Sequence, residues 1–134
     1  MTTTPMPDES GAVTKSTTHS VRETVSRLTD LLNTEGMKVF DVIDQSAEAL
    51  QAGLDLRETV MVIFGSPKAG TPVMDAVPLA ALDLPLKVLI WDDKGQTKVS
   101  YVAPSVITAR YRLTPDLGQN LAGIDALTDL VVAT

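Results

Sequence analysis

Residues 59–74 read TVMVIFGSPKAGTPVM, and this stretch decides how the chain folds. The run from Thr59 to Phe64 is apolar without alternation. It predicts a central strand, either covered on both faces or lying in the middle of a sheet packed on helices. The segment that follows, Phe64 to Met74, combines two glycines, two prolines, a lysine and a threonine. Its composition leaves two interpretations open: a rigid structural connection or a site that holds an anion.

The glycine-rich segment is not a nucleotide-binding P-loop. That motif needs Gly, four residues, Gly, Lys and then Ser or Thr, whereas here Thr71 and Pro72 follow Gly70, and Lys68 precedes it. A weaker anion site would use the charge of Lys68 and the close backbone approach that Gly65 and Gly70 allow. In this interpretation Thr71 caps a short helix that Pro72 opens.

Length, charge and composition limit the class of protein. The 134 residues fit one domain and are enough to bury a core without disulfides. The chain has no cysteine, so it can form no disulfide. The net charge of −6 argues against binding to nucleic acid or to an anionic membrane surface. The start of the chain does not resemble a signal peptide, and no apolar stretch is long enough to span a bilayer. We therefore expect a cytoplasmic protein that binds neither nucleic acid nor membranes.

The pattern along the chain predicts a disordered tail over residues 1–14 and a single α+β domain over residues 15–134. The clearest element is a helix over 21–34, with a capping box of Ser20 and Glu23 at its start and Gly36 as its left-handed stop. Strands are expected at 15–19, 37–43, 59–64, 86–91 and 97–102. Further helical segments are expected at 47–51 (capped by Ser46), 104–113 and 117–131, and residues 79–84 are expected to be a short helical or irregular piece.

This order of elements predicts a two-layer sandwich of a mainly antiparallel sheet with helices packed on one face. A doubly wound parallel fold is disfavoured because long helices do not alternate regularly with strands. Asp92 to Gln96 has the composition of a hairpin turn. Trp91 and Tyr101 would then be cross-strand neighbours in that hairpin, or would line a pocket.

Residues suited to acid–base or metal chemistry are few. His19 is the only imidazole, and it lies in a Ser/Thr-rich segment beside the first helix. Asp92 and Asp93 lie in a turn, where aspartate is favoured for local hydrogen bonds. We expect no metal site, because the acidic residues show no metal-binding spacing; no particular cofactor is indicated.

Three motifs resemble the bacterial domain-of-unknown-function 302 family. They are FGSPKAGTPVM at Phe64–Met74, LDLPLKVL at Leu82–Leu89 and VSYVAP at Val99–Pro104, and the similarity extends over about residues 16–133. Glu23-Thr24 and Gly36 also match the family pattern. The resemblance implies a compact α+β sandwich with a curved antiparallel sheet, and a homodimer. It implies no assigned activity.

The chain departs from relatives of this family at two places. One branch carries cysteines at the positions matching Phe64–Pro67 and Pro85–Leu86, so thiol chemistry does not transfer to this chain. Similar members have an Arg-His pair where this sequence has Arg110-Tyr111. Tyrosine has an ordinary pKa of about 10 and cannot replace a histidine base near neutral pH.

These observations favour a homodimer that binds a small, anionic ligand without catalysis. Lys68 and the amides near Gly70 and Thr71 would hold the anionic group, and Arg110 would help to close the site. The candidate ligand-binding residues are Gly65, Pro67, Lys68, Gly70, Thr71, Met74, Trp91, Arg110 and Tyr111. The alternatives are an enzyme that uses Tyr111, His19 or an aspartate, and an interaction module whose main surface is its dimer interface.

Overall fold

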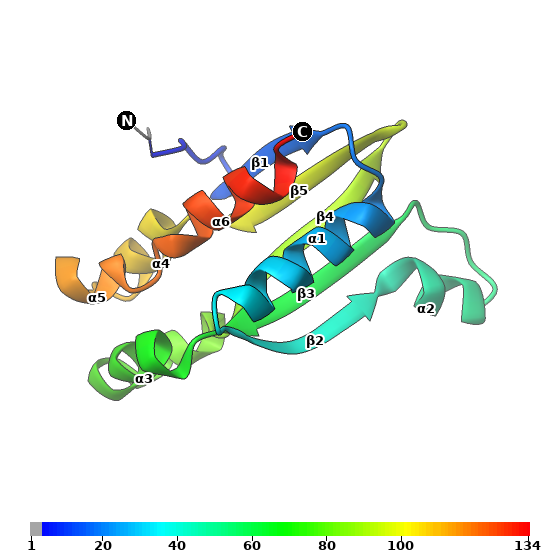
Figure 1. The fold of residues 1–134 in the computed structure, drawn as a ribbon. Coiled ribbons are helices and arrows are strands. Elements are labelled where there is room, and N and C mark those ends of the chain that lie inside the picture. Colours follow the sequence, from blue (N-terminus) through cyan, green and yellow to red (C-terminus); the bar gives the residue numbers. More distant parts are fainter. Residues whose placement is uncertain (1–3) are drawn as a thin grey trace.

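A computed structural model describes residues 4–134 as one open sheet with helices packed against it (Figure 1). The five strands are antiparallel in the order β1-β5-β4-β3-β2, so the predicted α+β sandwich is confirmed. The strands are β1 (Ala12–Thr17), β2 (Lys38–Asp44), β3 (Thr59–Gly65), β4 (Leu86–Asp93) and β5 (Gln96–Val102). The helices are α1 (Val21–Thr34), α2 (Gln45–Gln51), α3 (Pro67–Ala76), the 3-10 helix η1 (Pro78–Asp83), α4 (Pro104–Arg110), α5 (Pro115–Gln119) and α6 (Gly123–Val132).

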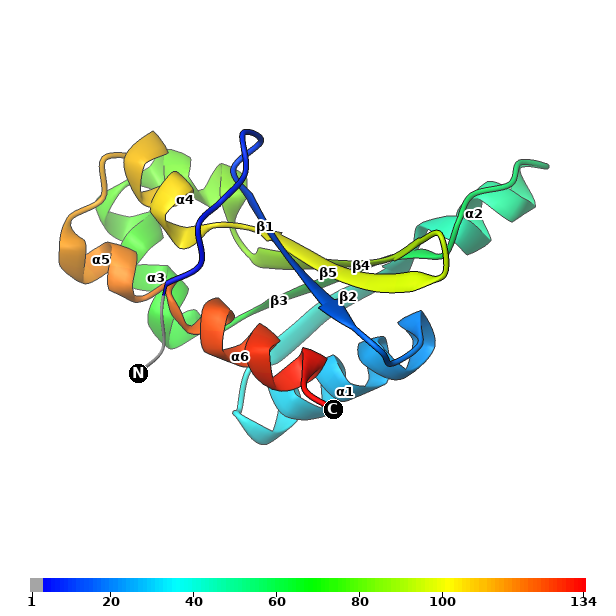
Figure 2. The ribbon, with the colours of Figure 1, turned by 90° about the horizontal axis from the view of Figure 1, so that it is seen from above.

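The core lies between the sheet and helices α1 and α6, which run side by side on one face (Figure 2). Side chains of β3 alternate between this face and the other, and Val62 and Phe64 are buried against the helices. Leu28 and Leu32, four residues apart on α1, are fully buried from the helix side. The apolar run in β3 is therefore covered by helices on one face only.

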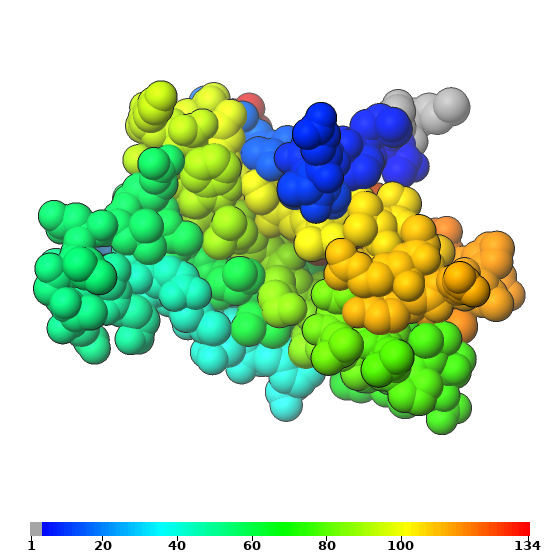
Figure 3. Space-filling model, turned by 180° about the vertical axis from the view of Figure 1, so that it is seen from behind, coloured from blue at the N-terminus to red at the C-terminus, as the bar shows by residue number. Residues whose placement is uncertain are grey.

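The opposite face of the sheet is not covered by α1 or α6 (Figure 3). In that view strand residues reach the surface between α2 at one end and helices α3 and α4 at the other. Met61 lies directly opposite Leu89 there, and Thr59 lies opposite Trp91. These side chains are only half-buried, which leaves an apolar strip on the outer face of β3 and β4.

The stretch Phe64–Met74 is the end of β3 and the beginning of α3. Ser66 precedes the helix and Pro67 lies in its first turn, where a fixed φ and a missing N–H are compatible with helix geometry. The expected helix start at Pro72 is wrong, because Pro72 lies inside α3. The helix is already established there, since the amide of Gly70 donates to the Ser66 carbonyl at 2.8 Å.

Caps at two helix starts were predicted with partial success. The Ser20 hydroxyl accepts the Glu23 amide at 3.0 Å, as expected for α1. The Glu23 carboxylate pairs with the Nδ1 atom of His19, so it does not complete the predicted capping box. Asp44, and not Ser46, caps α2, because its carboxylate accepts the amide of the third helical residue at 2.9 Å.

The N-terminal strand starts earlier than predicted, at Ala12 instead of Lys15. The Asp8 amide donates to the Ala12 carbonyl at 2.8 Å, and the Ala103 amide donates to the Gly11 carbonyl at 2.9 Å. In the stretch that the sequence assigns to a disordered tail, residues 8–11 therefore form a hydrogen-bonded turn, and residues 11–14 pair with the rest of the fold. Residues 1–3 of that expected tail lie outside the described residues.

The C-terminal helix expected over 117–131 is divided into α5 and α6. Gly118 is buried in α5 against Thr108 of α4, and Gly123 begins α6. Both glycines weaken a helix by about 1 kcal/mol relative to alanine. The two glycines therefore disfavour a single continuous helix over this segment, and tertiary packing sets the directions of α5 and α6.

A partly buried lysine links α6 to the sheet. The Lys15 ammonium of β1 donates to the Asp125 carbonyl at 2.9 Å and to the Thr128 hydroxyl at 2.7 Å, and it pairs with Asp129 at 2.8 Å. The Tyr101 hydroxyl of β5 donates to the Asp125 carboxylate at 2.6 Å. These contacts satisfy the polar groups that packing α6 on β1 and β5 would otherwise leave buried without partners.

Candidate functional site

A partly open, apolar cavity of about 220 Å³ lies at the end of β3. Its wall comes from the connection of α1 to β2, the start of α3, the segment before β4, and the junction of α5 with α6. The lining residues are Met37, Phe40, Phe64, Gly65, Ser66, Pro67, Ala69, Gly70, Thr71, Met74, Leu84, Pro85, Leu86, Asn120, Leu121, Gly123, Ile124 and Leu127. No charged side chain of the described chain lines this cavity.

The structure brings five of the nine candidate residues together in the wall of this cavity. They are Gly65, Pro67, Gly70, Thr71 and Met74. The other four, Lys68, Trp91, Arg110 and Tyr111, do not line it. The predicted residues in the segment after β3 therefore form one wall of the cavity, whereas the two cationic candidates, Lys68 and Arg110, do not line it.

Lys68 and Trp91 lie away from the cavity. Lys68 is exposed on α3. The Trp91 indole N–H donates to the Ser100 hydroxyl at 3.0 Å on the outer face of the sheet. Tyr101 is buried on the helix-covered face. The expected pairing of Trp91 with Tyr101 is thus wrong, because Trp91 lies opposite Lys98 and alternate residues of β5 point to opposite faces.

Arg110 and Tyr111 both bind an aspartate of η1. The Arg110 guanidinium donates to the Asp83 carboxylate at 2.8 Å, and the Tyr111 hydroxyl donates to the same oxygen at 2.5 Å. The next residues along the chain, 84–86, form part of the cavity wall. The two side chains therefore hold η1 against α4 and, through it, position the wall.

We expect the stability contributed by Asp83 to be lost in acid. The hydrogen bond from Tyr111, supplemented by Arg110, holds the pKa of Asp83 below its ordinary value. A carboxylate with a lowered pKa in the folded state stabilises the protein above its unfolded pKa of about 4, and this contribution disappears as the pH falls further.

The measurement is urea unfolding of wild type and Asp83→Asn between acid and neutral pH. The wild type should be more stable at neutral pH, and the difference should shrink steadily below about pH 4. A difference that stays constant across this range would contradict the assigned role of the carboxylate charge.

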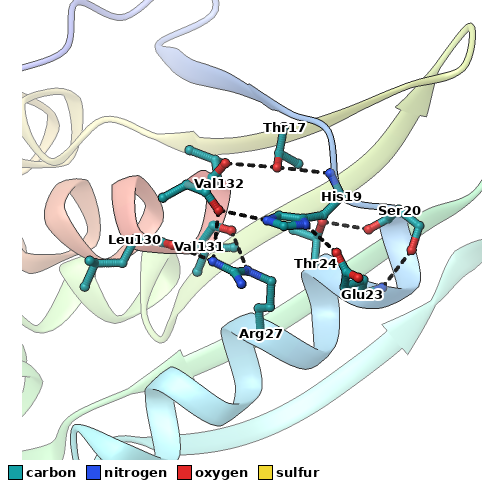
Figure 4. Close-up of polar contacts among 10 residues, drawn as sticks. Thr17, His19, Ser20, Glu23, Thr24, Arg27, Leu130, Val131 and Val132 are labelled. Atoms are coloured by element: carbon teal, nitrogen blue, oxygen red, sulfur yellow. Dashed lines mark hydrogen bonds and ion pairs between the residues drawn. The ribbon is translucent and has the colours of Figure 1, made fainter.

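His19 is part of a structural clamp at the C-terminus (Figure 4). Its Nδ1 atom pairs with Glu23, and its Nε2 atom lies 2.8 Å from the Ala133 carbonyl. Arg27 donates from the same side to the carbonyls of Val131 and Leu130, each at 3.1 Å. These contacts occupy the imidazole and satisfy the carbonyls at the end of α6, so His19 lies at a helix terminus and outside the cavity.

Neither tyrosine has a pKa near neutrality. Burial and then the hydrogen bond to Asp125 raise the pKa of Tyr101, and the hydrogen bond to Asp83 raises the pKa of Tyr111. Both shifts keep the hydroxyl protonated at pH 7 and make it less suited to act as a general base. Among residues 4–134, no cluster of three or more His, Cys, Asp or Glu side chains could hold a metal ion.

Two helical glycines on the cavity wall have no steric explanation. A Cβ atom at Gly70 would only touch Met74 at 3.8 Å, and one at Gly123 would meet nothing within 4 Å. Neither glycine has a positive φ angle. Alanine would strengthen both helices by up to about 1 kcal/mol each. At Gly70, which is partly buried inside α3, glycine leaves space beside Met74 at the expense of helix stability, whereas Gly123 is exposed at the first position of α6.

A second hollow, of about 800 Å³, lies between the N-terminal segment and helices α4, α5 and α6. Its wall is more polar and includes Arg112, Asp125 and Asp129. None of the nine candidate residues lines it. The smaller cavity is therefore the one on which the sequence motif and the structure converge.

Sequence reasoning missed most of the cavity wall. Met37, Phe40, Leu84, Leu121 and Ile124 come from segments far apart in the chain. One local signal was present in the sequence: Val39 and Phe40 are adjacent apolar residues in a strand, which breaks a simple alternation. In the structure, the β2–β3 register shifts at this point. Such a bulge turns the second side chain out of the alternation.

Comparison with known proteins places the chain in a family. The family model described as "Domain of unknown function DUF302" matches residues 13–131. A crystal structure of an uncharacterized conserved DUF302 protein from Bacillus stearothermophilus superposes with a TM-score of 0.78. It covers 91% of this chain and 95% of the other at 22% identity, which shows a common fold.

Curated relatives carry the name of a transport protein. The chain is 38% identical over 106 residues to the fluoride-specific ion channel FluC 1 of Brucella suis, and equally to FluC 1 of Brucella abortus. The match covers 78% of this chain but only 42% and 39% of those relatives, so the chain spans less than half of their length. Among the residues that the structure describes, no helix has the length and hydropathy of a membrane span. The match to the family model over nearly the whole chain shows that this protein belongs to the DUF302 family.

Proposed function

We propose that this protein binds a small, uncharged, mainly apolar molecule in the cavity at the end of β3. The observation that supports this most directly is the cavity itself, about 220 Å³ and walled almost entirely by apolar side chains. Small-molecule sites are concave and predominantly apolar, with few polar groups. Gly70 supports the same conclusion, because it is partly buried in the wall and a Cβ atom there would meet only Met74, at 3.8 Å.

The size of the cavity limits the ligand. A cavity of about 150 Å³ holds one benzene molecule. In proportion, 220 Å³ would hold about nine non-hydrogen atoms. The ligand is therefore a metabolite fragment or small aromatic compound, and nucleotides are too large to be enclosed.

The anionic ligand expected from the sequence is less well supported than an uncharged one. Transfer of an ionised carboxylate into an apolar cavity is costly unless a cation or several donors meet it. Lys68 is exposed outside the wall, and Arg110 is already paired with Asp83. We therefore assign the cavity to a neutral molecule and treat an anion as an alternative outcome of the experiment.

The test measures the binding of toluene and of its charged analogue benzoate. Binding is detected by changes in the amide chemical shifts of the protein and by an increase in its thermal stability. Toluene at 100 times its dissociation constant should stabilise the protein by about 2.7 kcal/mol. Gly70→Leu should fill the cavity and weaken toluene binding at least tenfold. Ala76→Leu, on the exposed surface of the same helix, is the matched control and should bind toluene as wild type does.

Two results would decide against the neutral ligand. If toluene changes neither the spectrum nor the stability of the wild type, the cavity does not bind small apolar molecules. If benzoate binds more tightly than toluene and Lys68→Ala removes that preference, the anionic site expected from the sequence is correct.

We also propose that the protein acts as a homodimer, joined through the outer face of the sheet. Met61 and Leu89 form an uncovered apolar strip on this face. Ile63 lies in one row between Asp41 and Lys87. A two-fold axis through such a row would place opposite charges of two copies across from each other, and it would bury the strip.

Sedimentation velocity distinguishes this arrangement. The wild type should sediment as a dimer and Leu89→Glu as a monomer with an unchanged circular dichroism spectrum. Leu130→Glu, at a position 56% exposed on the helix side of the molecule, should remain dimeric. A wild type that is monomeric at high micromolar concentration would exclude the dimer.

A second candidate function is that of an accessory domain in fluoride export. The observation that favours it is the 38% identity to part of the Brucella fluoride channels. The measurement is fluoride efflux from liposomes that contain a channel of this type, with and without added protein. An unchanged efflux rate, together with no fluoride-induced change in the amide spectrum, would remove this candidate.

The cytoplasmic location expected from the sequence remains a prediction, which cell fractionation would check.

A further inference from the structure

The mouth of the cavity is formed by an aromatic side chain that the fold leaves exposed. Phe40 lines the cavity, yet 46% of its surface is open to solvent. It occupies the point where the β2–β3 register shifts between Val39 and Asp41. The bulge interrupts the alternation of side chains along β2 and changes the direction in which Phe40 points. Its ring therefore lies at the cavity and not over the sheet.

The ring of Phe40 is held in this position from two sides. A Cβ atom added to Gly65 would lie 3.4 Å from the ring, so glycine at this position allows the ring to lie against the β3 backbone. The Lys38 ammonium lies 5.2 Å from the ring centroid, within the range of a cation–π contact. The ring is therefore positioned without being buried.

The remaining wall offers groups that suit an aromatic ligand. Phe64 presents a second ring, and Met37 and Met74 present thioethers, which make favourable contacts with aromatic rings. The Ser66 hydroxyl makes no cap hydrogen bond within α3, so it can accept or donate one hydrogen bond to a ligand at the cavity wall.

We infer that the ligand is a neutral aromatic molecule of one or two rings, and that Phe40 is the residue that covers it at the mouth of the cavity. This inference rests on the proposed function and deepens it by naming the ligand class. An aromatic ligand seated against Phe64 would meet the exposed ring of Phe40. Stacking there would remove apolar surface from solvent that the free protein leaves uncovered.

Titration calorimetry with three probes tests both parts. Indole has about the nine non-hydrogen atoms that the volume allows, while toluene and methylcyclohexane share a carbon count but differ in aromaticity. The wild type should bind indole and toluene more tightly than methylcyclohexane. Phe40→Leu keeps an apolar side chain but removes the ring, and it should weaken indole binding about twofold to tenfold.

Val42→Ala is the matched control, because Val42 is 40% exposed on the same strand and does not line the cavity. It should bind indole as wild type does. If Phe40→Leu binds indole as tightly as wild type while Gly70→Leu does not bind it, Phe40 does not cover the ligand and the cavity function stands. If methylcyclohexane binds as well as toluene, the aromatic class is wrong. If none of the three probes binds, the proposed function fails and this inference fails with it.

Discussion

Phe64→Ala should destabilise the protein by about 3–5 kcal/mol. Phe64 is 2% exposed, and it lies at the end of β3 where the core and the cavity wall meet. Removal of the ring loses its transfer free energy and enlarges a space that already exists. Because domains are stable by only about 5–15 kcal/mol, this change removes a large part of the total.

Urea unfolding followed by circular dichroism measures this loss, with Phe40→Ala as the matched control. The same substitution at a ring that is 46% exposed should destabilise by less than about 2 kcal/mol, because less apolar surface returns to water. Equal losses at Phe64 and Phe40 would contradict the arrangement of the core.

Gly118→Ala should destabilise the protein by about 1–2 kcal/mol, although alanine is the better helix former. An added Cβ atom would lie 2.7 Å from the Thr108 hydroxyl oxygen and 3.1 Å from its methyl carbon. The hydroxyl is held by its hydrogen bond to the Pro104 carbonyl at 2.8 Å. Overpacking costs roughly 1–3 kcal/mol, and the gain in helix propensity offsets part of this.

The cause of this loss can be isolated with a second substitution. In a Thr108→Ala background the clashing atoms are gone, so Gly118→Ala should then lose less than about 0.5 kcal/mol, a non-additivity typical of residues in contact. Gly123→Ala, where nothing lies within 4 Å of the added atom, should be neutral or slightly stabilising. Equal losses for Gly118→Ala in both backgrounds would show that the contact with Thr108 is not responsible.

Elements with local signals were predictable from sequence. The helix over 21–34 was confirmed over its whole length, because Ser20 supplies the cap and Gly36, with φ of 72°, supplies the stop. The hairpin turn was also confirmed, since Lys94 and Gly95 both have positive φ angles, as a two-residue turn of this type requires. Each of these outcomes depends on a few neighbouring residues.

The cavity required contacts that no local signal contains. Gly70 and Thr71 were predicted to belong to a site because they lie in one unusual stretch. The opposite wall comes from Phe40, Leu84 and Ile124, which reach it only after the sheet has formed. Arg110 was proposed as a ligand-binding residue from its charge and from its match to the Arg-His pair of similar family members, and only the folded chain shows that Asp83 binds it.

The sequence by itself determined the sandwich, the hairpin and the importance of the stretch after β3, since hydrophobic periodicity and turn chemistry act within short segments. Tertiary structure alone decided what that stretch does. Packing placed its glycines on an apolar wall, directed Lys68 to solvent and turned Phe40 to the mouth of the cavity. The physical reason is that the apolar and uncharged character of a site depends on which distant segments meet there, and this follows from how the whole core is packed.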